Sequence, residues 1–147
     1  TLDLVIAGRL DDADYYNQII RTAKKMDIQD NVHLVGQISE NEKSWYFNNC
    51  KAFAFPSTAE GFGLPVAEAM SAGKPLFLSN KTALPEIGGK VAFYFSSFEP
   101  EHMHKVFSEG IFEYQKNGLA NKIINRGKEF NWDNASAEYL KIYQSLY

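Results

Sequence analysis

The sequence is poor in cysteine, in net charge of either sign and in long apolar runs. Its single cysteine, Cys50, cannot form a disulfide within the chain, so we expect a small hydrophobe in a buried strand and a fold that tolerates the reducing cytoplasm. The formal net charge is −3, with charged side chains spread along the chain, which disfavours a nucleic-acid partner. No apolar run approaches the roughly 20 residues of a membrane-spanning helix. We therefore expect a cytoplasmic globular protein.

The 147 residues are the size of one domain, and strand-like and helix-like patterns alternate along them. We expect strands at residues 4–7, 32–35, 50–55, 75–78 and 91–95, the first of them buried, and helices at 13–25, 39–48 and from 65. Ser39 and Glu42 have the spacing of a capping box at the start of the second helix. From residue 100 the pattern is helical, broken at 117–118 and near 131, with a last helix over 135–147. This order favours an α/β fold, a doubly wound parallel sheet with helices on both faces and a C-terminal helical segment.

A glycine-rich turn between a predicted strand and a predicted helix is the most informative segment. Gly61 and Gly63 flank Phe62 and allow positive φ and close approach of a ligand. Pro65 suits the first position of a helix. Unpaired N–H groups around Gly63, Leu64 and Val66 would then favour a phosphate or a diphosphate.

Two glutamates, Glu60 and Glu68, bracket this turn. They would repel a bare phosphate at short range, so they need another role. A carboxylate can accept strong hydrogen bonds from two neighbouring hydroxyls, the pattern that a ribose or a hexose offers. The turn as a whole therefore predicts a site for a sugar nucleotide.

The spacing of Glu60 and Glu68, with Gly61-Phe62-Gly63-Leu64-Pro65 between them, resembles the signature of the retaining GT-B glycosyltransferases of group 1 (family 4). Three further segments recur in that family in this order, namely residues 31–36, 72–75 and 83–87. The resemblance runs from about Leu2 to the final helix. It implies that residues 1–147 form a single Rossmann-like domain, the C-terminal donor-binding half, with the N-terminal acceptor domain absent.

Roles for individual residues follow from the resemblance. It implies that Glu60 is catalytic and lies near the transferred sugar, while Glu68 holds the ribose hydroxyls. The remaining donor-contacting residues implied in this way are Gly61, Phe62, Gly63, Leu64, Pro65 and Val66 around the phosphate and sugar, and Gly36, Gln37 and Ile38 along the base.

The resemblance also implies a reaction. A hexose would pass from a nucleotide diphosphate sugar, with UDP or GDP as the nucleotide, to a carbohydrate or lipid-linked acceptor, with retention and without a metal or a cofactor. Polysaccharide biosynthesis and peripheral membrane association of the full-length enzyme fit this picture. The basic residues that usually contact the diphosphate belong upstream of Thr1, and Arg9 does not match their motif. We therefore expect this chain alone to bind weakly and to be inactive.

Each of the two glutamates also has a local explanation that involves no ligand. Glu68 in a first helical turn would interact favourably with the helix dipole, and Glu60 would be a solvated loop acid. Glycoside hydrolysis also uses paired carboxylates, but a diphosphate leaving group needs little protonation, which favours transfer.

Other motifs are assigned to ordinary structure. Asp12-Ala13-Asp14 resembles a metal-binding pattern, yet its position favours a helix cap. His102 and His104 are two residues apart and make poor co-ligands on a helix, and His33 fits a strand. A non-catalytic doubly wound signalling or interaction domain is the alternative, but a phosphoacceptor would need an aspartate near Ser57.

The last predicted helix carries an aromatic stripe that includes Tyr139 and Tyr143. Its spacing favours a face packed on the core of the domain. If instead this helix returns toward a second domain, as it often does in the family, Trp132 and the tyrosines would form an exposed apolar patch.

Overall fold

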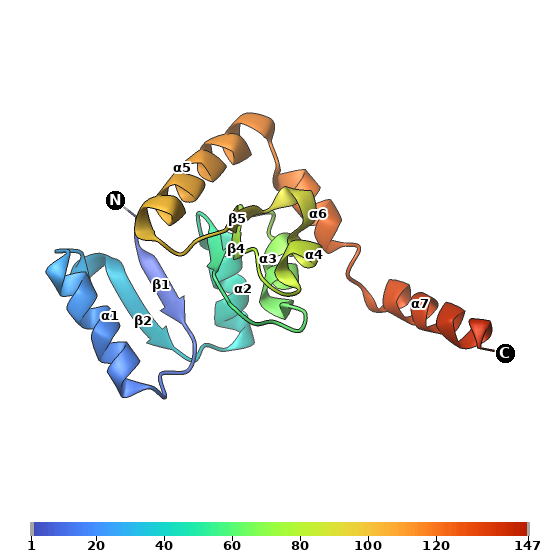
Figure 1. Ribbon diagram of the computed structural model, residues 1–147, viewed down its shortest axis with the longest axis horizontal. Coiled ribbons are helices and arrows are strands. Elements are labelled where there is room, and N and C mark those ends of the chain that lie inside the picture. Colours follow the sequence, from blue (N-terminus) through green and yellow to red (C-terminus); the bar gives the residue numbers. More distant parts are fainter. Residues whose placement is uncertain (1, 147) are drawn as a thin grey trace. The chain divides into compact units, whose positions relative to one another are not determined.

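The structure is a computed structural model that describes residues 2–146 in two compact units, the first ending at Trp45 and the second beginning at Tyr46 (Figure 1). Every strand pair within each unit is parallel. The predicted α/β class with parallel strands is confirmed, and its strands form one two-stranded and one three-stranded sheet. The single domain expected over residues 1–147 stays a prediction.

The first unit contains one strand–helix–strand crossover. Its elements are β1 (Leu4–Ala7), α1 (Ala13–Lys25), a short 3-10 turn η1 (Gln29–Asn31) and β2 (Val32–Gly36), followed by the start of α2 (Glu40–Asn49). β1 and β2 pair in parallel, and the backbone N–H of Gly8 continues the ladder to the carbonyl of Gly36 at 2.9 Å. The predicted bounds of α1 are confirmed.

Strand β1 is less buried than its apolar sequence predicts. The side chain of Leu4 is 51% exposed, and Val5 is also exposed. The expectation of a buried strand is wrong within the described residues, because β1 has β2 as its strand neighbour in a sheet of two, which leaves its apolar side chains little cover.

Helix α2 begins with the capping box predicted from the sequence. The backbone N–H and the hydroxyl of Ser39 both donate to Glu42 Oε2, at 2.8 Å and 2.7 Å, and Ser39 Oγ accepts from the N–H of Glu42 at 3.3 Å. These bonds to the carboxylate hold the pKa of Glu42 below its usual value. The local sequence therefore determines where this helix starts.

The second unit contains three parallel strands in the order β3-β4-β5. Its elements are β3 (Phe53–Phe55), α3 (Leu64–Ser71), β4 (Leu76–Ser79), α4 (Leu84–Gly88), the 3-10 turn η2 (Gly89–Val91), β5 (Phe93–Phe95), α5 (Pro100–Asn117), α6 (Ala120–Gly127) and α7 (Trp132–Ser145). The predicted breaks in the C-terminal helical region are confirmed.

The central strand β4 is buried on both faces. Leu76 and Leu78 belong to the core cluster formed with α3, α4 and α6. Phe77 points to the opposite face, where its ring lies 5.3 Å from that of Phe93 and 4.8 Å from that of Phe107 on α5. Helices therefore cover both faces of this sheet, as predicted.

The third strand starts later than the sequence suggested. Cys50 follows α2 directly, donating its N–H to the carbonyl of Tyr46, and β3 begins only at Phe53. The thiol of Cys50 is half-buried, and burial raises its pKa. Its expected place inside a buried strand is wrong, because the C-terminal end of α2 takes this residue.

Helix α7 has no buried residue, so the expected core face is wrong. Trp132 is 89% exposed, and Tyr139 and Tyr143 are exposed on the same helix. The exposed patch expected for a helix without its natural cover is what the structure has. Among the described residues, no helix is both long and apolar enough to cross a membrane.

Candidate functional site

The glycine-rich segment lies at the carboxyl edge of the three-stranded sheet. The loop of residues 56–63 connects β3 to α3, and the loop of residues 80–83 connects β4 to α4. Because β3 and β4 are parallel neighbours, both loops leave the same edge. This edge is where open parallel sheets usually bind ligands. We define residues 60–68 as the glutamate–glycine segment.

A buried serine joins the two loops at their bases. The hydroxyl of Ser79, which is fully buried, donates to the carbonyl of Ser57, and it accepts from the backbone N–H of Lys81 at 3.3 Å. A buried hydroxyl without partners would cost free energy, so this pairing fixes the separation of the loops. Ser79 thus connects the two loops where they leave the sheet.

The backbone of Glu60 is held by a second contact between the same loops. Its N–H donates to Thr82 Oγ1 at 3.0 Å. Thr82 has φ +48°, which is rare for a β-branched residue and indicates a strained backbone. The loop before α4 therefore adopts an unfavourable conformation at Thr82, and in this conformation the Thr82 hydroxyl accepts the N–H of Glu60.

The fold requires glycine at only one of the two positions 61 and 63. Gly63 precedes α3 with φ +92°, and a Cβ on it would lie 2.9 Å from Leu84 Cδ2, so both conformation and packing require glycine. Gly61 has no positive φ, and a Cβ on it would meet nothing within 4 Å. The expected positive φ is confirmed at Gly63 and wrong at Gly61, where the fold itself accepts a side chain.

The start of α3 is less open than predicted. The backbone N–H of Val66 donates to the carbonyl of Gly63 at 2.9 Å, and the Val66 side chain is fully buried. Pro65 is the second residue of the helix rather than the first and has no N–H. The expectation that the Val66 N–H is available to an anion is therefore wrong, because it closes the first turn. Leu64, the first residue of the helix, is 66% exposed.

Glu68 occupies the second turn of α3, four residues after Leu64. The first turn of this helix carries no acid, so favourable interaction with the helix dipole does not account for Glu68. Its side chain is half-buried, and its Oε2 atom is closed off from solvent. One oxygen of this carboxylate is therefore shielded from solvent, although the side chain as a whole is only partly buried.

Phe62 extends the segment toward the C-terminal helices. Its ring packs edge-on against Phe130, with centroids 5.6 Å apart and an interplanar angle of 86°. Phe130 lies between α6 and α7, far away in the sequence. Phe62 thus anchors the loop against the connector between α6 and α7.

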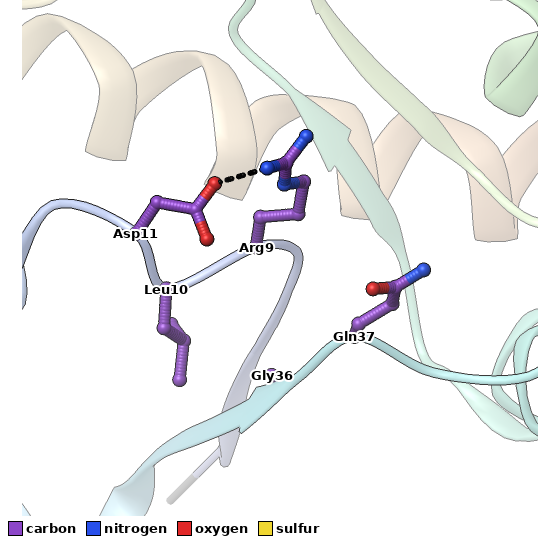
Figure 2. Close-up of a pocket in the computed structure, with 5 residues that line it drawn as sticks. All are labelled: Arg9, Leu10, Asp11, Gly36 and Gln37. Atoms are coloured by element: carbon purple, nitrogen blue, oxygen red, sulfur yellow. Dashed lines mark ion pairs between the residues drawn. The ribbon is translucent and has the colours of Figure 1, made fainter.

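The residues expected to line the base belong to the first unit. Gly36, with φ +72°, and Gln37 line an open pocket of about 470 Å³, together with Arg9, Leu10 and Asp11 (Figure 2). Arg9 Nη2 pairs with Asp11 Oδ2 at 2.7 Å, and both side chains are largely exposed. Ile38 is not part of this lining.

The other candidate sites have local structural roles. Asp12 caps α1 by accepting the N–H of Tyr15 at 2.9 Å, so the capping interpretation is confirmed. His102 accepts the N–H of Ser96 at 3.3 Å, and His33 lies in β2 beside Asp3 at 3.4 Å. Within residues 2–146, no three His, Cys, Asp or Glu side chains are grouped for metal binding.

Several residues of the two candidate regions escaped the sequence reasoning. Ser79 and Thr82 lie in a strand end and a loop without a motif, and Phe130 is about seventy positions from its partner Phe62. Arg9 had been set aside because it matches no motif, yet it lines the same pocket as Gly36. Only the Gly8–Arg9 turn after a strand could have drawn attention to it.

Comparison with known proteins shows the family of this chain. Residues 1–130 match the family described as glycosyl transferases group 1. The chain is 28% identical over 119 residues to the O-antigen chain mannosyltransferase B of Escherichia coli, covering 78% of this chain and 30% of that protein. It is 37% identical over 65 residues to the MMP alpha-(1->4)-mannosyltransferase of Mycolicibacterium hassiacum, covering 44% of this chain and 16% of that protein.

Solved structures share the fold. The Anabaena Alr3699/HepE structure in complex with UDP aligns with a TM-score of 0.83 at 19% identity, over 98% of this chain and 41% of that chain. Its complex with UDP-glucose aligns with a TM-score of 0.82 at 19% identity, over 97% of this chain and 41% of that chain. The chain thus spans less than half the length of these relatives. The match over residues 1–130 shows that this chain belongs to the group 1 glycosyl transferases.

Proposed function

We propose that this chain is the donor-binding part of a retaining GT-B glycosyltransferase, which transfers a hexose from a nucleotide diphosphate sugar to a carbohydrate or lipid-linked acceptor. The acceptor is bound by a domain outside this chain, in a cytoplasmic enzyme that associates peripherally with membranes during polysaccharide biosynthesis. Without that domain the chain binds its donor weakly and catalyses no transfer.

One observation carries the proposal. The glutamate–glycine segment lies at the carboxyl edge of parallel strands, with Glu60 held by Thr82 and Glu68 inside α3. In the proposed complex, Glu68 accepts hydrogen bonds from the ribose hydroxyls, and Glu60 faces the transferred sugar. The N–H of Leu64 at the exposed start of the helix meets the diphosphate.

Gly61 supports the same assignment independently. Neither its backbone conformation nor its surroundings require glycine in the ligand-free fold. A bound donor explains the glycine, because a ligand lying against the backbone leaves no room for a Cβ. Gly61→Ala should therefore leave the free energy of unfolding almost unchanged and weaken donor binding.

The comparisons support a choice of donors to test. The mannosyltransferase names of the curated relatives support mannose as the hexose, and the UDP and UDP-glucose complexes of the structural relatives support a uridine nucleotide. We propose UDP or GDP as the nucleotide. The base-lining role of Gly36, Gln37 and Ile38 stays a prediction, which the amides of these residues will report during titration.

The test is an NMR titration of the chain with UDP, GDP and ADP and with their hexose conjugates. Glu68→Gln should lower the affinity for the free nucleotide and for its hexose conjugate alike, by about 10-fold to 100-fold, because a hydrogen bond to a charged group is lost. Glu60→Gln should leave the free nucleotide unaffected and remove the additional affinity that the hexose supplies.

Glu101→Gln is the matched control, because Glu101 is an exposed acid at the start of α5. It should bind every ligand as the unmodified chain does. Saturable binding that survives Glu68→Gln unchanged, or no binding by any nucleotide at millimolar concentration, would contradict the proposal.

A further inference from the structure

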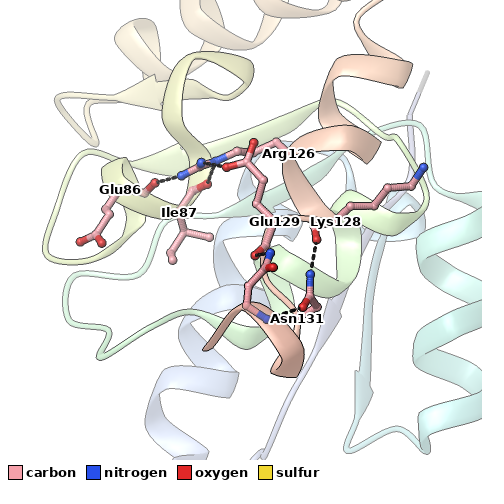
Figure 3. A network of polar contacts seen from close by, with 7 residues as sticks. Glu86, Ile87, Arg126, Lys128, Glu129 and Asn131 are labelled. Carbon is pink, nitrogen blue, oxygen red and sulfur yellow. Dashed lines mark hydrogen bonds and ion pairs between the residues drawn. The ribbon is translucent and has the colours of Figure 1, made fainter. Parts of the chain in front are cut away.

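The aromatic contact of Phe62 leads to an arginine that holds the far end of α4. Arg126, in the last turn of α6, donates through Nε to the carbonyl of Ile87 at 3.2 Å and through Nη2 to the carbonyl of Glu86 at 2.6 Å (Figure 3). Its Nη1 also contacts Glu129. The guanidinium thereby satisfies carbonyls at the C-terminal end of α4, where a cation is favourable.

The same guanidinium lies over an aromatic ring. Arg126 Cζ is 4.8 Å from the centroid of Phe130, within the range of a cation–π contact. The same ring packs edge-on against that of Phe62. Phe130 also packs against the core cluster, so three sets of contacts hold its side chain.

The connector that carries Phe130 is itself held by hydrogen bonds. The N–H of Phe130 donates to the carbonyl of Gly127 at 3.1 Å. Asn131 Nδ2 donates to the carbonyl of Lys128 at 2.8 Å (Figure 3). Asn134 Nδ2 donates to the carbonyl of Glu129 at 3.0 Å. These bonds close the turn between α6 and α7 and fix the position of the ring.

Both ends of α4 therefore reach the glutamate–glycine segment. Thr82, two residues before α4, accepts the N–H of Glu60, and Leu84 at its start packs beneath Gly63. At the other end of α4, Arg126 and Phe130 connect it to Phe62. The segment is thus braced at Glu60, Phe62 and Gly63, on either side of Gly61.

We propose that Arg126 and Phe130 are positioning residues that hold residues 60–63 through Phe62 in the conformation that binds the donor. This rests on the proposed function for the consequence in binding, but not for the ordering of the loop. Neither residue touches the donor. Their loss leaves Glu68 in place on α3 and makes the loop that carries Glu60 mobile.

Three variants of the full chain test this brace. Phe130→Leu keeps an apolar side chain and removes the ring between Arg126 and Phe62, and Arg126→Lys keeps the charge and removes the planar fork. Phe130→Tyr keeps the ring and should behave as the unmodified chain does. Tyr114→Phe is the matched control, because it removes a hydrogen bond to the carbonyl of Gly73 at 2.7 Å elsewhere in the unit.

The first measurement needs no ligand. Amide order parameters of residues 60–63 should fall from about 0.85 to below about 0.6 in Phe130→Leu and Arg126→Lys, with β4 unaffected. Tyr114→Phe should lower stability and leave these values unchanged. Unchanged order parameters in both brace variants, or an equal fall in Tyr114→Phe, would overturn the inference.

The second measurement is affinity for the nucleotide that the unmodified chain binds best. Phe130→Leu should weaken binding about twofold to tenfold, the range of one aromatic pair, and Phe130→Tyr should restore it. Mobile loops with unchanged affinity would overturn the link to binding. Absence of nucleotide binding by the unmodified chain would overturn the proposed function, whereas the order parameters would still decide whether the brace exists.

Discussion

Gly61 and Gly63, two residues apart, should respond in opposite ways to the same substitution. Gly63 has φ +92°, and an added Cβ would lie 2.9 Å from Leu84 Cδ2. A left-handed backbone costs an L-residue about 1–2 kcal/mol. Displacing the fully buried Leu84 adds about 1 kcal/mol. Gly63→Ala should therefore lower the free energy of unfolding by about 2–3 kcal/mol.

Gly61→Ala is the matched comparison. Its backbone has no positive φ, and its Cβ would meet nothing within 4 Å, so stability should stay constant or rise by about 0.4–1 kcal/mol through a less flexible unfolded chain. The assay is urea unfolding followed by the NMR signals of β4 amides, which report on the second unit. Equal losses in the two variants, or a Gly63→Ala variant within about 0.5 kcal/mol of the unmodified chain, would show that Gly63 is not required by the fold.

Three further predictions concern elements of the two units. Ser79→Ala should cost about 1–3 kcal/mol in urea unfolding, because the carbonyl of Ser57 loses the donor that the buried Ser79 supplies. Asp12→Ala should cost about 0.5–2 kcal/mol and fray the first turn of α1, measured by amide exchange in that turn. Burial raises the pKa of Tyr94 to about 12, so its stabilising contribution is complete below pH 10.0 and is lost as the pH rises toward 12. The difference in tyrosinate absorbance between the unmodified chain and the Tyr94→Phe variant should therefore titrate with a pKa of about 12.

The features predicted most accurately from the sequence are those that local chemistry determines. The capping box of Ser39 and Glu42, the cap of α1 at Asp12 and the left-handed Gly63 all depend on contacts within a few residues. The glutamate–glycine segment was recognisable for the same reason, since its spacing lies within one turn and one helix.

The features it missed depend on distant residues or on neighbours. Leu4 is apolar enough for a buried strand, but burial also requires sheet neighbours that β1 lacks on one side within the described residues. The spacing of Tyr139 indicates an amphipathic helix without showing what covers it. Phe62 contacts Phe130 because α6 packs on α3. No local sequence pattern reveals that packing.

We propose that residues 60–68 bind the sugar-nucleotide donor. An amide chemical-shift map of the chain with the nucleotide sugar that binds best tests this directly. The amides of Gly61, Phe62, Gly63 and Leu64 should shift together and saturate at one common dissociation constant. Saturable shifts elsewhere in the chain that leave these four amides unmoved would contradict it.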